Sequence, residues 1–163
     1  MVNALGNMSL IYHSGIGYSE DLCEDITSWF LNTFFPNHEI EVEIIHSDLT
    51  EEDCNGVCDF VGNATSNPRE FVIELNSNME HELYAKTLLH ELTHLAQWVR
   101  GDLQMKRGKI YYLNEPASNY DYVYQPHEIL AREEENRLLD WWICDHNDMP
   151  VEQVAQLFAT PAS

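Results

Sequence analysis

Basic residues are scarce in this chain of 163 residues, and their scarcity limits what the protein can bind. Eight lysines and arginines stand against twenty-eight aspartates and glutamates, so the formal net charge is −20. A field of this sign repels phosphate backbones, and we therefore expect no direct nucleic-acid binding. It favours basic partners or basic peptide substrates, although a merely solvated acidic surface would have the same composition.

Long hydrophobic runs are also missing. No apolar stretch approaches the roughly 18–20 residues that cross a bilayer, so we expect no membrane association. The first residues, MVNALGNMSLIYHS, lack the basic start and the apolar segment of a secretory signal. We expect an intracellular, cytoplasmic protein, located in the host cytoplasm if a phage encodes it. The length and a hydrophobic content of 44% suit one domain over residues 1–163.

Cysteines are few, which argues against a disulfide framework. The four are Cys23, Cys54, Cys58 and Cys144, and in an intracellular chain we expect free thiols. Cys54 and Cys58 have a spacing that weakly matches structural zinc sites. Because no second pair follows them, four ligands cannot be completed, and because only Cys144 lies farther along the chain we expect no C-terminal zinc ribbon.

The pattern of apolar residues predicts an α+β fold. Apolar residues at helical spacing predict an N-terminal helix over 19–35, with Ser19 as its N-cap and Pro36 as its stop. Short apolar and alternating segments predict a small antiparallel sheet of three strands, or four with the first. These strands are expected at 8–14, 39–48, 57–62 and 71–75.

A long central helix is predicted next. Ser77 and Glu80 have the spacing of a capping box, and the helix is expected to run to about Arg100, with Gly101 as its stop.

The rest of the chain is expected to alternate between loop and helix. Residues 102–124 lack a long period and predict an irregular, functional segment with a turn at Arg107 and Gly108. A third helix is predicted over 125–143, and a short final one over 149–159.

The central helix contains the pattern H-E-x-x-H, formed by His90, Glu91 and His94. At about 100° per residue the two histidines lie about 40° apart on one stripe, so both imidazoles can reach one ion. Glu91 projects beside the position of a metal-bound water. Zinc peptidases use this spacing, with the glutamate as general base. The alternative is a chance match in a chain rich in histidine and glutamate, and the long capped helix around the motif argues against it.

A catalytic zinc ion needs a third protein ligand and an open fourth position. Gln97 and Arg100 stand where the metzincin extension has a glycine and a third histidine, so the ligand must come from farther along the chain. The segment 126–137, PHEILAREEENR, offers His127 and Glu128 at the start of a helix. Either could instead be an ordinary first-turn residue, and residue chemistry alone leaves the choice between them open.

Three consecutive glutamates, Glu133, Glu134 and Glu135, lie within a single turn farther along the same predicted helix. We expect them to form a solvated acidic face.

The segments TLLHELTHLAQW and YQPHEILARE resemble the small zinc metallopeptidases of the SprT-like, phage-type and ImmA/IrrE-type groups, including minigluzincin-like members. This resemblance implies a zincin-like fold, with an N-terminal helix, a small antiparallel sheet, the HExxH helix and a C-terminal helix carrying the third ligand. By matching positions, it implies a zinc ion held by His90, His94 and Glu128, with Glu91 as the base.

Two departures from these groups bear on the site. SprT-like proteins usually take a histidine as third ligand, which keeps His127 in consideration. Arg132 stands where the larger glutamate-zincin pattern E-x-x-x-D has its aspartate.

The expected function is that of a zinc metalloendopeptidase, with Glu91 as general base on a zinc-bound water. The partner is a protein or peptide substrate, basic if the acidic surface selects it. Tyr122 and Tyr124 precede the third predicted helix and could donate to the oxyanion, or could only pack. A strand edge at 71–75 could bind substrate by strand addition.

The alternative function is an acidic binding or decoy protein for a basic partner, with a structural or vestigial zinc site. The intact Glu91 argues against it, because a purely structural site needs no base.

Overall fold

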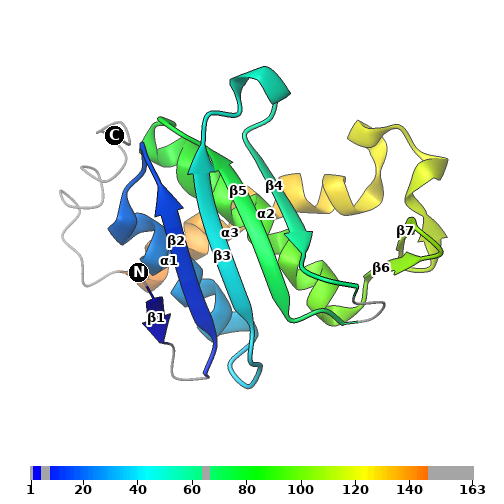
Figure 1. The fold of residues 1–163 in the computed structure, drawn as a ribbon, viewed down its shortest axis with the longest axis horizontal. Coiled ribbons are helices and arrows are strands. Elements are labelled where there is room, and N and C mark those ends of the chain that lie inside the picture. Colours follow the sequence, from blue (N-terminus) through cyan, green and yellow to red (C-terminus); the bar gives the residue numbers. More distant parts are fainter. Residues whose placement is uncertain (1, 5–7, 64–66, 147–163) are drawn as a thin grey trace.

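The computed structural model describes residues 2–4, 8–63 and 67–146, which form an α+β structure (Figure 1). The main sheet has the strand order β1-β2-β3-β5-β4. Its strands are β1 Val2–Ala4, β2 Leu10–Gly15, β3 Glu41–Ser47, β4 Gly56–Phe60 and β5 Glu70–Asn76. Three α-helices of the described ranges lie behind the sheet in Figure 1: α1 Glu20–Phe34, α2 His81–Arg100 and α3 Pro126–Asp145.

The centre of the sheet is parallel, so the expected antiparallel sheet is wrong there. Strand β3 pairs in parallel with both β2 and β5, and only β1 and β4 pair antiparallel at the edges. The reason lies in the connection through α1, because a crossover helix returns the chain to the starting end of the sheet. Alternation of apolar residues shows which face of a strand is buried, but not the direction of its neighbour.

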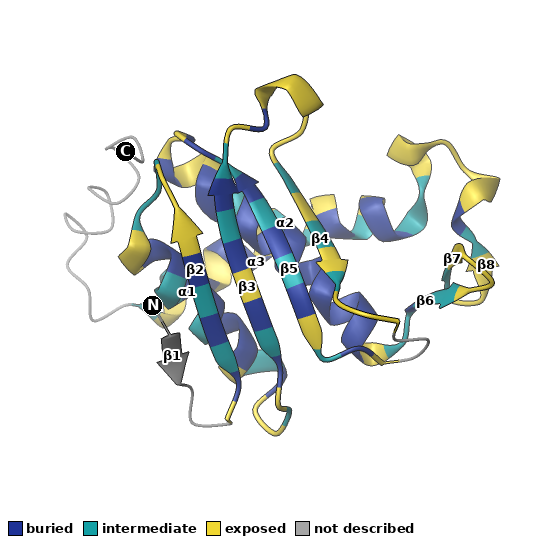
Figure 2. Cartoon of the chain, viewed as in Figure 1, coloured by how far each residue is buried: buried dark blue, intermediate teal, exposed yellow. Residues whose placement is uncertain are grey.

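The helices cover one face of the sheet and leave the other open. Inward side chains such as Val42, Ile44 and Ile73 are fully buried, whereas Glu43 on the opposite face is exposed. In Figure 2 the buried residues concentrate where the helices meet the sheet. The alternation read from 39–48 therefore predicted correctly which side chains enter the core.

The ends of α1 confirm the predicted N-cap, whereas the predicted start of α2 is wrong. The Ser19 hydroxyl accepts from the Leu22 amide, as expected for an N-cap. Ser77 is not the cap of α2, because its amide donates to Ser47 and extends the strand pairing. Glu80 caps that helix instead, through a bond of 2.7 Å from the Leu83 amide.

The C-terminal end of α2 lies where the sequence predicted it. Gly101 ends α2 with φ at 80°, as predicted.

Within the described ranges, the structure contains no helix long and apolar enough to cross a membrane. The helix expected at 149–159 lies outside the described residues.

The segment 102–124 is more regular than expected. It contains a small sheet of β6 Leu103–Lys106, β7 Lys109–Tyr112 and β8 Glu115–Pro116, followed by 3₁₀ turns at Ala117–Asn119 and Tyr122–Tyr124. The predicted turn at Arg107 and Gly108 closes the β6–β7 hairpin. Strands of two to four residues are too short to show a period, which is why the sequence indicated a loop.

A buried histidine, His46, lies near the end of β3 and is held in one neutral tautomer. Its Nδ1 lies 2.9 Å from the carbonyl oxygen of Ser14, which can only accept, so Nδ1 carries the proton. Its Nε2 therefore accepts from the Tyr84 hydroxyl, 2.8 Å away. The Tyr18 ring stacks on the imidazole at 3.5 Å. Burial lowers the pKa of His46 to about 4, and the charge of His13 acts in the same direction.

We expect this histidine to make folding stability depend on pH. The unfolded chain binds a proton at His46 near pH 6.5 and the folded chain only near pH 4, so stability is complete above pH 6.5 and falls as the pH drops towards 4. Between about pH 7.5 and about pH 5 the loss from this group is about 2 kcal/mol. Urea unfolding of the wild type and His46→Gln at both pH values measures it. Equal losses in the two proteins would contradict the assignment.

Candidate metal centre

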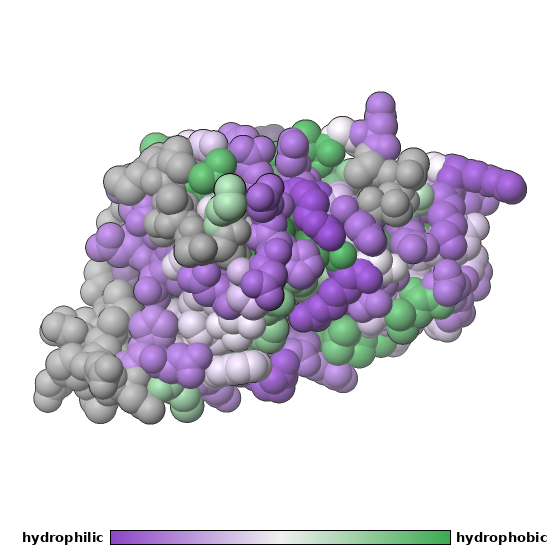
Figure 3. All heavy atoms as spheres, turned by 90° about the horizontal axis from the view of Figure 1, so that it is seen from below, coloured by the Kyte–Doolittle hydropathy of each residue, from purple (hydrophilic) through white to green (hydrophobic). Residues whose placement is uncertain are grey.

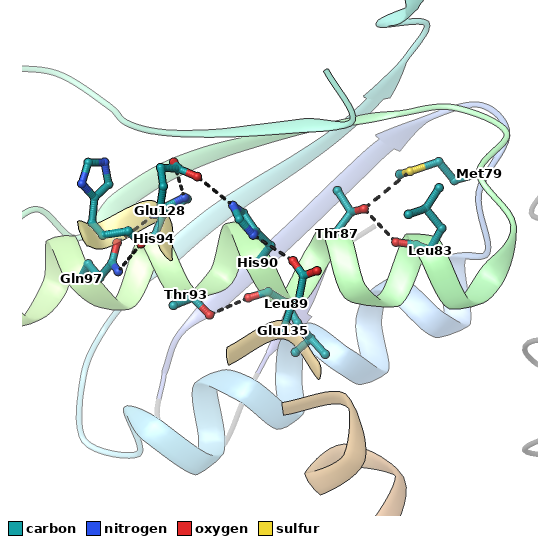
Figure 4. A network of polar contacts seen from close by, with 11 residues as sticks. Met79, Leu83, Thr87, Leu89, His90, Thr93, His94, Gln97, Glu128 and Glu135 are labelled. Carbon is teal, nitrogen blue, oxygen red and sulfur yellow. Dashed lines mark hydrogen bonds and ion pairs between the residues drawn. The ribbon is translucent and has the colours of Figure 1, made fainter. Parts of the chain in front are cut away.

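Three side chains from two helices converge on one point. His90 and His94 lie one turn apart on α2, and Glu128 lies in the first turn of α3. The carboxylate of Glu128 faces both imidazoles, with Oε2 at 3.3 Å from His90 Nε2 and Oε1 at 2.9 Å from His94 Nε2 (Figure 4). One ligand atom from each residue lies within 4.8 Å of the others, so the group could hold a metal ion.

The packing of α3 against α2 brings Glu128 to this point. Pro126 starts α3 after an extended Gln125, and the small side chain of Ala131, one turn later, is completely buried. Of the two candidates left open by the sequence, the structure brings Glu128 to the histidine pair. His127 is also buried, but it lies beside His94 with ring centroids 5.7 Å apart and is not part of the ligand group.

The electrostatics of the three residues fit a cation. Burial alone would lower the pKa of His90 and His94, but hydrogen bonds and the charge of Glu128 outweigh it and raise both pKa values. The two histidines hold the pKa of Glu128 well below its ordinary range despite burial. His94 Nε2 is buried, and the Glu128 carboxylate 2.9 Å away is the polar group that it faces. A charged carboxylate facing two imidazole nitrogens needs a proton or a metal ion between them.

The outer nitrogens of both histidines are fixed by further contacts. His90 Nδ1 lies 3.0 Å from a carboxylate oxygen of Glu135, which accepts its proton. Gln97 Nε2 donates to the carbonyl oxygen of His127 at 3.1 Å, so Gln97 Oε1 accepts from His94 Nδ1 at 2.8 Å. Both Nδ1 atoms therefore carry protons, and both Nε2 lone pairs are free to face the centre (Figure 4).

Sequence reasoning missed both supporting residues. Glu135 was expected on a solvated acidic face, and that expectation is wrong for this residue. It lies seven positions after Glu128, two turns along the same helix face, which is the signal that could have identified it. For Gln97, the sequence shows only that it stands where the metzincin extension has a glycine.

Glu91 lies beside the ligand group without belonging to it. Its side chain is 5% exposed. Burial raises the pKa of Glu91 to about 7, with the charge of Glu128 adding to the rise and the two histidines opposing it. A carboxylate with such a pKa can take and return a proton near neutral pH.

A cleft of about 290 Å³ opens beside the ligand group. Strand β4 forms one wall at Gly56, where an added Cβ would lie 3.1 Å from Glu91 Cγ, so the missing side chain permits this close approach. The cleft is lined from β4, α2, the β6–β7 hairpin and the start of α3, by residues that include Cys58, Trp98, Leu103, Ile110, Tyr122, Gln125 and His127.

The two candidate tyrosines differ in position. Tyr122 lines the cleft, and its pKa is raised to about 12 by burial, by the charge of Glu128 and by a hydrogen bond to that carboxylate. Both tyrosines are 65% exposed, but Tyr124 is not among the residues that line the cleft.

All four cysteines are free, as expected. Cys58 lines the cleft, while Cys54 is exposed and lies at a separate hollow beside Asn76.

No family model matches the chain, and no curated protein or solved structure matches it either. A function for this chain is therefore inferred from the geometry and chemistry of the site itself.

We predict that Glu135→Gln weakens metal binding by about 10- to 100-fold, because the carboxylate that orients and polarises His90 is replaced by a neutral amide. Competition titration with a chromogenic chelator measures the dissociation constant. Glu133→Gln is the matched control, because it removes the same charge from an exposed position two residues earlier. Equal effects of the two changes would show that only net charge matters.

Proposed function

We propose that this protein is a zinc-dependent metalloendopeptidase, with a zincin-like arrangement similar to that of the SprT-like and minigluzincin-like groups. One observation supports it above the others: His90, His94 and Glu128 converge on one point, and a buried Glu91 lies beside them at an open cleft. The H-E-x-x-H spacing on α2 and a distant glutamate on α3 are the combination that this chemistry needs.

Two imidazoles and one carboxylate suit zinc better than calcium or magnesium, which prefer oxygen ligands alone. When bound, the ion would polarise the attacking water and the scissile carbonyl. The three residues would hold it, because their Nε2 and carboxylate atoms are directed at one point.

Glu91 is the proposed proton carrier. It takes a proton from the attacking water and delivers it to the leaving amine, and a pKa near 7 matches both steps. Tyr122 is the proposed donor to the oxyanion. Because its pKa is raised to about 12, its hydroxyl keeps the proton at neutral pH and can donate throughout.

The substrate is proposed to bind along β4. The expected strand edge at 71–75 is not free, because β5 pairs with β3 on one side and with β4 on the other. Strand β4 is the outermost strand of the described sheet, and Gly56 and Cys58 on it line the cleft. An extended peptide can add to such an edge through main-chain hydrogen bonds.

We predict that Glu91→Gln abolishes peptide hydrolysis while zinc remains bound, because the amide keeps the shape of the side chain but cannot accept the proton. A fluorogenic casein digest, with metal content by atomic absorption, measures both properties. Zinc binding without hydrolysis in the wild type would instead favour the acidic binding or decoy protein.

We predict that Tyr122→Phe lowers kcat by about 100-fold, the usual cost of losing one oxyanion donor, with little change in KM. Tyr124→Phe is the matched control two residues away, because its ring lies outside the cleft lining. Steady-state kinetics on one peptide substrate compares them. Similar kcat values for the two variants would exclude Tyr122 as the donor.

A further inference from the structure

The few basic residues of this chain are unevenly distributed. Three of the eight, Lys106, Arg107 and Lys109, fall within four consecutive positions. All three are exposed at the tip of the β6–β7 hairpin. In the space-filling view, strongly hydrophilic side chains extend from the right-hand end of the molecule, where Figure 1 places β6 and β7 (Figure 3). We call these three residues the basic tip.

The hairpin presents these charges in a fixed and unfavourable arrangement. Lys106 and Lys109 are direct cross-strand partners, and Arg107 and Gly108 close the turn with φ of 54° and 75°. Like charges placed directly opposite each other in a sheet destabilise it. Among the described residues, none of the chain's many acids forms an ion pair with the basic tip.

The only polar anchoring found for the basic tip in the described ranges is uncharged. Lys106 Nζ donates to Asn114 Oδ1 at 3.2 Å and lies 5.3 Å from the centre of the Tyr111 ring. These contacts orient Lys106 without neutralising it, so the positive charge of the tip stays available to a partner.

The basic tip lies at the rim of the cleft. Ile110 lines the cleft and directly follows Lys109, and Leu103 at the start of the same hairpin lines it too. Side chains alternate along a strand, so Lys109 points to the opposite face of the hairpin from Ile110. Lys106, the cross-strand partner of Lys109, shares that outer face, so the basic tip lies beside the cleft and not in its lining. A polypeptide that leaves the cleft at Ile110 reaches the basic tip by passing around the edge of the hairpin.

We propose that the basic tip binds an acidic segment of the polypeptide substrate that lies outside the cleft and flanks the part held in it; this inference rests on the proposed peptidase function. Salt screens charges beyond about 8 Å, so a bound segment responds to the nearby cations more than to the distant acids of the molecule. The net charge of −20 favours basic substrates and the cleft lining contains Asp59, Glu91 and Glu128, whereas the exposed tip of the hairpin beside the cleft carries only positive side chains. A polypeptide is favoured over a nucleic acid, because the rest of the chain repels a phosphate backbone.

Binding is tested on Glu91→Gln protein loaded with zinc, by fluorescence anisotropy of two peptides. They share one central sequence and differ in a flank of three glutamates or three glutamines on one side. We expect about tenfold tighter binding of the glutamate peptide, a preference that disappears at high salt. The flank is placed on either side in turn, because the direction of the bound chain is part of the test. Equal binding in both placements would overturn the proposal.

The double change Arg107→Asn/Lys109→Gln should remove this preference, and asparagine suits the left-handed backbone at position 107. Lys86→Gln/Arg137→Gln is the matched control, because it removes two charges outside the basic tip and the cleft lining. Loss of the preference in both double variants would overturn the proposal. Tip-dependent binding of a labelled single-stranded oligonucleotide, without a preference between the peptides, would also overturn it and point to a nucleic acid.

Hydrolysis separates this proposal from the function on which it rests. Wild-type cleavage of both peptides at equal kcat/KM would leave the peptidase standing and remove the role of the basic tip. Tip-dependent binding of the glutamate peptide without any cleavage would remove the peptidase and keep the tip as a site for acidic polypeptide.

Discussion

The contact of one carboxylate with two imidazole nitrogens is the interaction on which the functional argument depends. Glu128 lies 3.3 Å from His90 Nε2 and 2.9 Å from His94 Nε2, at a point where both histidines are mostly or fully buried. Such a triad is costly to bury unless a proton or cation compensates it. The triad is nevertheless buried, because the first turn of α3 packs directly against the middle of α2.

The supporting contacts extend that constraint through both helices. Glu135 contacts His90 from α3, two turns beyond Glu128, so the same helix supplies one member of the candidate metal centre and the contact that orients another. Gln97 links His94 to the backbone of His127, which ties α2 to the start of α3. A shift of either helix would therefore disturb the ligands and their orientation together.

The sequence was most informative where the chemistry is local. His90, Glu91 and His94 lie within one turn and a half of helix, so their spacing alone predicts their relative placement. Glu128 is 34 residues beyond His94, and its position depends on how two helices pack. Residue types could narrow the third ligand to His127 or Glu128, but only the packing around Ala131 places Glu128 at the histidines.

The same limit explains the errors in the fold. Alternation in β3 predicted which residues are buried, yet strand direction depends on the path of α1, which no local pattern records. The strands β6 to β8 were missed because four residues are too few to establish a period. The turn between β6 and β7 was predicted correctly because a left-handed backbone, as at Gly108, strongly favours glycine.

The net charge of the chain is a poor guide to the charges at its candidate site. A net charge of −20 describes the field far from the protein, where it governs solubility and repulsion of other polyanions. The relevant groups at the cleft are a buried acid with a pKa of about 7, three residues that could hold a metal ion and, beside the cleft, three exposed basic residues. Each of these groups acts over a few ångströms, which is shorter than the distance at which salt screens charges. A chain this acidic can therefore hold a metal ion at its centre and still offer a positive surface to what enters beside it.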